Sequence, residues 1–220
     1  MGAKTWMLVA SDDDARKALQ GPPVLDRAAT LRLCSALFPG EQLEERGESS
    51  LLEALPYGRE VTAGVVNGVA VVACFDFLLE RPSQLPVRFL QALGKRHVYL
   101  HCMISTIDGF AYAHWIDGQL QRSLSLAADS GVIEDIGERY EFERPYWAGE
   151  HPACDPDEEP DSYPFVFHPL DLGEAALREF FGYQLEGLVD DSLLEPESVP
   201  LLRFERRLPW WQRWLSRLKA

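Results

Sequence analysis

Two tight-turn signals, Asn67-Gly68 and Asp117-Gly118, constrain the fold of this chain more than any other feature of its sequence. Asn-Gly and Asp-Gly favour the positive φ angles of a two-residue hairpin loop, so each pair is expected to join two antiparallel strands. The apolar segments that flank the two turns span 61–66 and 69–77, and 109–116 and 119–127. Two further apolar segments, 3–10 and 97–104, predict additional strands.

Helix signals lie between and after these segments. The predicted helices span 12–19, 26–38, 83–93, 172–182 and 209–219, with Asp26 and Asp171 as helix caps. The polar stretch 41–60 predicts a long connection with one helical turn near 50–55, and the proline-rich stretch 129–170 predicts loops. We therefore expect an α/β (α+β) fold, a mixed, largely antiparallel sheet of about five to six strands covered by helices. Residues 1–205 are expected to form a single domain.

The charge balance is strongly acidic, with 21 Lys and Arg against 35 Asp and Glu and a net charge of −14. Such a field repels phosphate backbones, so nucleic acid is not an expected partner. It suits a basic protein partner, whose association it would accelerate, and it also serves solubility alone. The four cysteines include no C-x-x-C pair, which argues against a zinc finger and against a thioredoxin-like redox protein.

Neither a signal peptide nor a membrane-spanning segment is predicted. The apolar run at the start is too short for a signal peptide and is followed directly by Asp12, Asp13 and Asp14. The longest apolar stretches fall well below the ~18 residues of a spanning helix. A cytoplasmic protein with reduced thiols is therefore expected.

Three histidines carry the only metal-site alternative. His97 and His101 share one face of a predicted strand, and His114 lies on the next strand. If those strands pair, His101 and His114 approach each other, but zinc needs three or four ligands of defined geometry. Hydrogen-bonded histidines of a sheet are the other interpretation, and no metal or cofactor is predicted.

The segment 143–152 is dense in side chains that are common at functional sites. Glu150 and His151 suit acid–base chemistry, and Tyr146 and Trp147 suit a stacking wall. Packing of the two aromatic rings onto the sheet is the structural alternative. No G-x-S-x-G, P-loop or G-x-G-x-x-G motif is present, so no catalytic residue is predicted.

Acidic residues are concentrated between 134 and 161. Glu134, Asp135 and Glu138 resemble a carboxylate cluster, which is weak evidence for glycosidase chemistry. Asp155–Asp161 is interrupted by prolines and does not match an EF-hand. A solvated loop and a surface for a basic partner are both open interpretations. The residues predicted to bind a partner are Glu134, Asp135, Tyr146, Trp147, Glu150, Asp157, Glu158 and Glu159.

Residues 206–220 are expected to form a basic amphipathic helix rich in tryptophan. Residues 203–219 carry six basic side chains against Glu205, a charge of +5, so the rest of the chain carries −14 − 5 = −19. Such a helix either lies on an anionic membrane, docks into a partner, or folds back on the acidic body. The residues predicted to make these contacts are Trp210, Trp211, Arg213, Trp214 and Arg217.

Several ordered motifs carry a family resemblance over residues 1–190. They include Met1-Gly2-Ala3-Lys4-Thr5, Leu37-Phe38-Pro39-Gly40 and Pro145-Tyr146-Trp147-Ala148-Gly149-Glu150-His151-Pro152. On these motifs the chain resembles an uncharacterised bacterial family, a domain of unknown function, and the resemblance implies no activity. In size and acidity it also resembles immunity proteins that neutralise secreted antibacterial toxins, including those of type VI secretion, although this is an analogy of class.

Three functional hypotheses follow. The first is a non-enzymatic, immunity-type inhibitor that binds a basic, nuclease-like toxin acting in the cytosol. The second is a small enzyme or ligand-binding protein with a pocket at Tyr146, Trp147, Glu150 and His151, beside His101 and His114. The third is a membrane-surface or scaffold protein that acts through the C-terminal helix. The oligomeric state is left open by the sequence.

Overall fold

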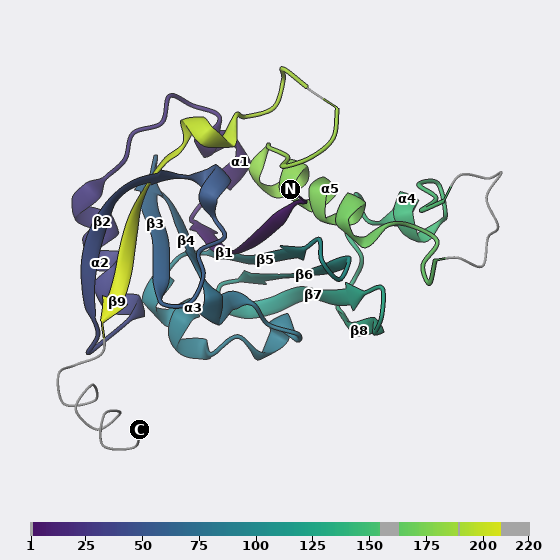
Figure 1. Ribbon diagram of the computed structural model, residues 1–220, viewed down its shortest axis with the longest axis horizontal. Coiled ribbons are helices and arrows are strands. Elements are labelled where there is room, and N and C mark those ends of the chain that lie inside the picture. The colour runs from purple at the N-terminus through teal and green to yellow at the C-terminus, as the bar shows by residue number, and fades with distance from the viewer. Residues whose placement is uncertain (1, 155–162, 189, 208–220) are drawn as a thin grey trace.

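The computed structural model describes residues 2–154, 163–188 and 190–207. Nine strands of this part of the chain form one open sheet in which every pairing is antiparallel (Figure 1). The strands are β1 (Lys4–Ser11), β2 (Gln42–Ser50), β3 (Glu60–Val66), β4 (Val69–Cys74), β5 (His97–Ile104), β6 (Gly109–Ile116), β7 (Gln119–Ala127), β8 (Gly131–Ile136) and β9 (Pro200–Arg207). Their order across the sheet is β2-β9-β3-β4-β1-β5-β6-β7-β8.

Five α-helices and four 3-10 turns accompany the sheet in the described residues. The helices are α1 (Ala15–Leu19), α2 (Arg27–Leu37), α3 (Val87–Leu93), α4 (Arg144–Trp147) and α5 (Pro169–Phe181). The 3-10 turns are η1 (Leu51–Glu53), η2 (Phe75–Phe77), η3 (Pro82–Gln84) and η4 (Pro196–Ser198). The α+β class expected from the sequence is therefore confirmed.

The predicted sheet was too small, and its predicted mixed pairing was wrong. The stretch 41–60 contains the strand β2 rather than a long connection, although the predicted helical turn near 50–55 is present as η1. The strands β8 and β9 were not predicted. The predicted helix at 83–93 divides into η3 and α3, and the helix predicted at 172–182 begins at Pro169 with His168 as its cap. Arg206 and Arg207 end β9, so they lie in the sheet and not in a C-terminal helix.

Both predicted hairpin turns are present and show why Asn-Gly and Asp-Gly are needed. Asn67 has φ 50° and Gly68 φ 82°, and Asp117 has φ 50° and Gly118 φ 76°. Two consecutive positive φ angles match the right-handed twist of the strands that the turn joins. Asn67 also binds the chain beside it, since its Oδ1 accepts from Val24 N at 3.1 Å.

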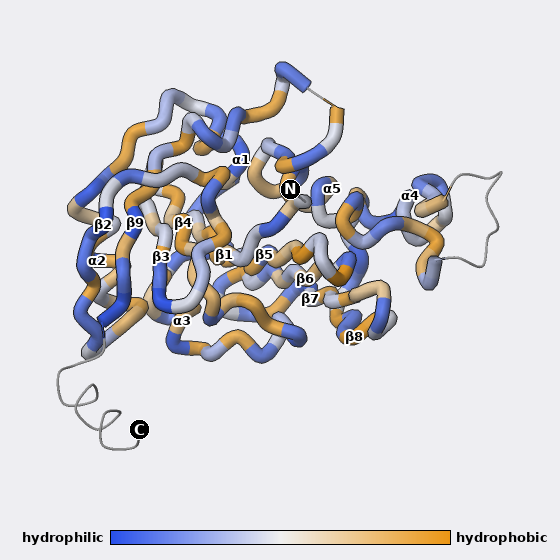
Figure 2. The backbone as a smooth tube through the Cα atoms, in the orientation of Figure 1, coloured by the Kyte–Doolittle hydropathy of each residue, from blue (hydrophilic) through white to orange (hydrophobic). Residues whose placement is uncertain are grey.

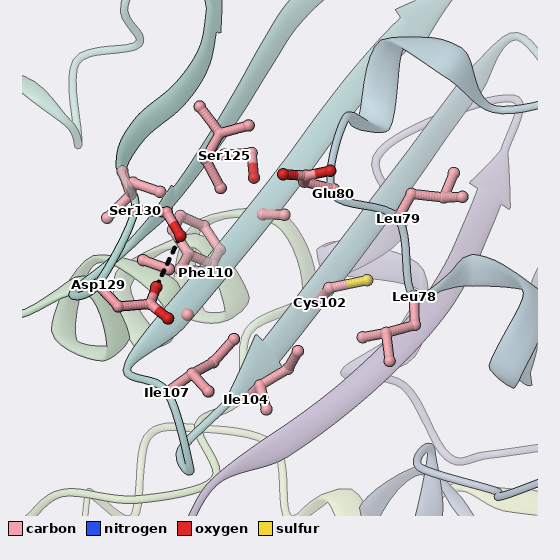
Figure 3. A pocket seen from close by; sticks show the side chains of 15 residues that line it. Leu78, Leu79, Glu80, Cys102, Ile104, Ile107, Phe110, Ser125, Asp129 and Ser130 are labelled. Carbon is pink, nitrogen blue, oxygen red and sulfur yellow. Dashed lines mark hydrogen bonds between the residues drawn. The ribbon is translucent and has the colours of Figure 1, made fainter.

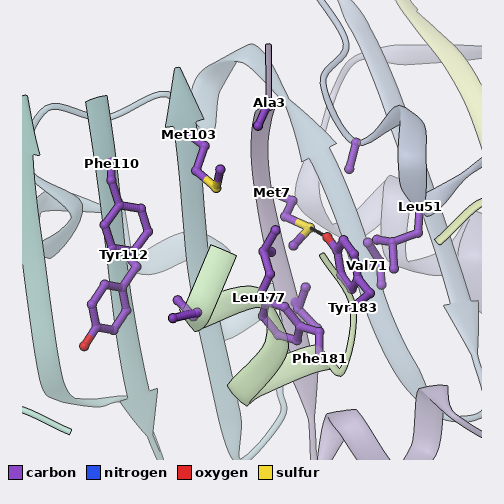
Figure 4. Packing of buried hydrophobic residues seen from close by; sticks show 14 of the residues in the cluster. Ala3, Met7, Leu51, Val71, Met103, Phe110, Tyr112, Leu177, Phe181 and Tyr183 are labelled. Atoms are coloured by element: carbon purple, nitrogen blue, oxygen red, sulfur yellow. Dashed lines mark hydrogen bonds between the residues drawn. The ribbon is translucent and has the colours of Figure 1, made fainter. Parts of the chain in front are cut away.

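Alternate residues of the central strands point into two separate cores. On one face, Met7 of β1 and Met103 of β5 pack against Leu177 and Phe181 of α5 (Figure 4). On the other face, Trp6 and Leu8 of β1 belong to the core that contains Phe38, Phe77 and Phe89, and α2 and α3 cover it. The hydropathy map shows apolar residues along the central strands (Figure 2). The sheet is thus covered on both faces, as expected from its apolar central strands.

Candidate functional site

A buried polar network lies where β6 and β7 meet the segment before α4. The Arg122 guanidinium donates to both carboxylate oxygens of Glu143, at 2.9 and 2.7 Å, and neither side chain is exposed. Tyr112 donates its hydroxyl to Glu143 at 2.5 Å, and Arg122 also donates to Asp135 at 2.5 Å. Every charge inside this network has an opposite charge or a hydrogen bond, which is the condition for burying charge without a large penalty.

A row of stacked rings continues from this network towards the surface. His97 Nδ1 and His114 Nε2 are 3.2 Å apart, and His114 Nδ1 lies 2.6 Å from the Tyr140 hydroxyl. Tyr99 stacks on His114 with ring centroids 4.2 Å apart. Burial, and then the neighbouring His97, lowers the pKa of His114 to about 4. The histidine that pairs with His114 is therefore His97 and not His101.

His101 is sealed inside the core. Its Nε2 lies 3.1 Å from the carbonyl oxygen of Gly173 in α5, and its Nδ1 is buried without a hydrogen-bond partner in the described structure. Burial lowers the pKa of His101 to about 4. The described residues contain no group of three His, Cys, Asp or Glu side chains placed to hold a metal ion. His97, His101 and His114 each lie within hydrogen-bonding distance of a neighbouring group.

The aromatic segment around α4 packs as part of the fold. Tyr146 is 6% exposed, its hydroxyl donates to the carbonyl of Asp171 at 3.2 Å, and its ring stacks on His151. Trp147 packs edge-on against Phe167, under the guanidinium of Arg139. Glu150 is exposed. Tyr146 and Trp147 are thus occupied in packing, and the predicted convergence of this segment with His101 and His114 on one cleft is not supported by these contacts.

The predicted acidic contacts differ in how available they are. Glu134 is 7% exposed and accepts hydrogen bonds from Ser83 N at 3.0 Å, from the Ser83 hydroxyl at 2.6 Å, and from the Ser123 hydroxyl. Burial opposes the ionisation of Asp135, but hydrogen bonds from Arg122 and Arg139 outweigh it and lower the pKa of Asp135. Glu134 is therefore occupied by hydrogen bonds within the protein, whereas Glu150 and the exposed side of the Asp135 carboxylate are open to a partner.

Two groups of predicted contacts lie outside the described residues, and their predicted roles stay predictions. They are Asp157, Glu158 and Glu159, and the helix residues Trp210, Trp211, Arg213, Trp214 and Arg217. In the part of the chain that is described, no helix is both long enough and apolar enough to cross a membrane.

An acidic groove follows the segment after α5. It consists of two adjoining depressions of about 560 and 410 Å³, which share Leu52, Leu185 and Glu186. The acidic residues that line the groove are Glu53, Glu60, Glu186, Asp190, Asp191 and Glu195. The first depression also contains Lys4 and Arg203, whereas the described lining of the second contains four carboxylates and no Lys or Arg.

The groove has a defined shape because its wall is hydrogen-bonded to α5. Leu185 N and Glu186 N donate to the two carboxylate oxygens of Glu174, at 2.8 and 3.0 Å. Leu194 N donates to the carbonyl of Gly182 at 2.8 Å, which closes the segment at its other end. Exposed apolar side chains lie beside the carboxylates, since Tyr57 is 54% and Leu188 91% exposed. This combination of apolar anchors and charge is common at protein interfaces.

This groove was not predicted from the sequence. A signal was present, because Glu186, Asp190, Asp191, Glu195 and Glu197 fall within twelve positions with no Lys or Arg among them. What the pattern does not show is that this segment lies beside η1 and the start of β1, which are far away in the sequence.

Comparison with known proteins gives one match. The model of a protein family of unknown function matches residues 5–204, which confirms the family resemblance. No curated protein and no solved structure matches the chain.

Proposed function

This chain belongs to that family of unknown function, DUF6928, and from this premise we propose that it is a non-enzymatic acidic binding protein, an immunity-type inhibitor that binds a basic, nuclease-like bacterial toxin acting in the cytosol. The observation that carries the proposal is the acidic groove beside η1 and the segment 184–196. Its carboxylates can form ion pairs with a partner surface rich in Lys and Arg, and its apolar residues can pack against that partner as anchors.

The distribution of basic side chains supports the same proposal. Six arginines near β2 and β9 are already paired with carboxylates of the protein itself. They are Arg27 with Glu45, Arg46 with Glu44 and Glu205, Arg59 with Glu41, Arg203 with Glu53, Arg206 with Glu41 and Asp76, and Arg207 with Glu44. One of these pairs, Arg203 with Glu53, lies in the first depression, so the unpaired acidic excess of the groove is in the second depression.

Glu186 and Asp191 are the groove residues best placed to meet a basic partner. Both are exposed, both line the second depression, and neither has an ion pair within the described structure. Hydrogen bonds from Ser192 lower the pKa of the neighbouring Asp190, which keeps that carboxylate ionised. A partner arginine that enters this depression therefore meets Glu186 and Asp191, which have no ion pair of their own within the described structure.

The test compares two double charge reversals that change the net charge equally. Glu186→Lys/Asp191→Lys alters the groove, and Glu138→Lys/Glu150→Lys alters the exposed carboxylates around α4. Each variant and the parent protein are immobilised and used to recover partners from a lysate of the native bacterium. The recovered protein is then purified and titrated calorimetrically at low and high salt, and its enzymatic activity is assayed with and without this chain.

We expect one basic partner, inhibited on binding, whose affinity falls at least about tenfold for the groove variant, changes little for the α4 variant, and weakens with salt. Equal losses of affinity for the two variants would mean that the partner responds to the overall charge of the protein and not to the groove. A partner whose affinity ignores both charge reversal and salt, or whose activity is unaffected by binding, contradicts the proposal.

A further inference from the structure

A second cavity, remote from the acidic groove in its lining residues, lies on the opposite face of the sheet from α5. The segment from η2 to η3 crosses this face above β5, β6 and β7 and leaves a space of about 320 Å³ (Figure 3). The cavity is lined by fifteen residues, among them Cys102 and Ala111 of the apolar floor. Its size is at the lower end of the range for small-molecule sites.

The roof of the cavity is fixed at both ends. The Cys102 thiol lies 2.9 Å from the carbonyl of Phe77, and Ser83 is bound to Glu134 through its backbone N and its hydroxyl. Arg81 Nη1 donates to the carbonyl of Ile133 in β8 at 3.0 Å. The residues between these anchors, Leu78 to Glu80, line the space. The cavity is therefore a built feature of the fold, and Glu134 acts in it as a positioning residue.

One polar side chain lines this apolar space without a hydrogen-bond partner among the described residues. Ser125 of β7 is 3% exposed and lines the cavity, and its hydroxyl has no hydrogen bond to any described group. Its neighbour on the same face of the strand, Ser123, donates to Glu134. A hydroxyl that lines the cavity without an intramolecular partner can form a hydrogen bond with a polar group of a ligand, so Ser125 is a ready contact.

Carboxylates supply the charge at the rim. Figure 3 shows Glu80 with its carboxylate on the same side of the cavity as the Ser125 hydroxyl, and Asp129 on the other side. Asp129 accepts from the Ser130 hydroxyl at 2.7 Å, whereas Glu80 has no ion pair within the described structure. The described lining contains no Lys or Arg. An electroneutral fit at the Glu80 side requires a ligand that carries positive charge.

We propose that this cavity binds a small primary amine with an apolar body. Its ammonium group lies between the Glu80 carboxylate and the Ser125 hydroxyl and donates to both. Its hydrocarbon part covers the apolar surface formed by Leu79, Ile104 and Ile107. This site goes beyond the proposed function, because it shares no lining residue with the acidic groove and takes a different class of ligand.

Isoleucine methyl NMR reads out the cavity directly. The sequence contains five isoleucines, of which Ile104, Ile107 and Ile133 line the cavity and Ile116 and Ile136 do not. The full-length protein with labelled isoleucine δ1 methyl groups is titrated with hexylamine, hexan-1-ol and hexanoate at constant pH and ionic strength. We expect saturable shifts of the three cavity methyl groups, with hexylamine bound about tenfold more tightly than hexan-1-ol and hexanoate bound most weakly.

Two exposed glutamates supply a matched pair of variants. Glu80→Gln is expected to reduce the affinity for hexylamine to that for hexan-1-ol, whereas Glu138→Gln removes the same charge elsewhere and leaves the preference unchanged. Ala111→Leu fills the floor and is expected to abolish the shifts with all three ligands. The proposal is overturned if hexylamine and hexan-1-ol bind equally, if both glutamate variants lose affinity equally, if Ile116 and Ile136 shift as much as the cavity methyl groups, or if no ligand binds.

Discussion

Arg122 and Glu143 form a bidentate ion pair in which both side chains are entirely excluded from solvent. A buried charge left without its partner costs far more than an apolar side chain of similar size. We therefore expect Arg122→Met and Glu143→Leu each to lower the free energy of unfolding by about 3–5 kcal/mol. The double replacement should cost less than either single one, because it leaves no unpaired charge of the pair. Urea denaturation of the three variants measures these differences.

The exposed pair Arg144–Glu141 is the control, since its side chains are 63% and 83% exposed. Glu141→Ala should change the free energy of unfolding by less than about 0.5 kcal/mol. If the double variant at Arg122 and Glu143 is less stable than both single variants, the network is held by more than charge compensation.

Gly137 is expected to tolerate no side chain. Its φ is +84°, and a Cβ placed there would lie 2.0 Å from the backbone oxygen of Gln121. Gly149 has a similar φ of +79° but open space around it. Gly149→Ala should therefore cost about 1 kcal/mol of strain, and Gly137→Ala at least about 2 kcal/mol more, because the backbones must separate. Thermal and urea unfolding of both variants decides this, and equal losses would contradict the close approach.

Neutral His101 makes the protein sensitive to acid. Its pKa of about 4 in the fold lies below the value of about 6.5 in an unfolded chain. Between these values the unfolded state binds more protons, so this contribution to stability is complete above pH ~6.5 and is lost as pH falls towards 4. His101→Gln should remove up to roughly 3 kcal/mol of the difference in stability between pH 7 and pH 4.

Urea denaturation across this pH range, with His151→Gln as the control, measures the effect of His101. His151 is exposed, so its replacement controls for the loss of an imidazole side chain elsewhere in the chain. Identical pH profiles for the His101→Gln variant and the parent protein would show that His101 does not titrate as its burial requires.

Glu174 acts in the opposite direction. Burial raises its pKa to about 7, although Leu185 N and Glu186 N donate to the carboxylate. The folded state therefore holds the proton more tightly than the unfolded chain, and this contribution to stability is present below pH ~4.5 and lost as pH rises through 7. The free energy of unfolding of the Glu174→Gln variant, relative to that of the parent protein, should be higher at pH 8 than at pH 5 by up to roughly 3 kcal/mol.

The exposed Glu179 of the same helix supplies the comparison for Glu174. Both variants are unfolded in urea at pH 5 and pH 8, and Glu179→Gln controls for the loss of a carboxylate from the same helix. A Glu174→Gln variant whose relative stability is the same at both pH values would contradict the raised pKa.

The central strands were predictable because local chemistry determines them. The predicted bounds of β5, β6 and β7 agree with the structure, since apolar segments and the Asp117-Gly118 turn specify them together. β2 was missed because this edge strand carries mostly charged and polar side chains, and β9 because its pairing with β2 and β3 is fixed by residues about 150 positions away.

The candidate site was less predictable for the same reason. Glu134 was expected to contact a partner, but Ser83, fifty-one positions away in the chain, binds it inside the protein. Arg122 lies in a segment that shows no sign of the Glu143 carboxylate that it meets. A pattern of residue types predicts which faces of a strand are apolar, whereas it does not show which distant groups satisfy a buried charge.

The position of β9 between β2 and β3 has a consequence during protein synthesis. A ribosome releases β2 and β3 long before residues 200–207 exist, so the two strands must wait for the neighbour that separates them in the finished sheet. During that interval both present unpaired backbone groups, which invite pairing with other chains. The charged side chains of β2 then have a use before folding is complete, because they discourage nascent chains from associating at this open edge.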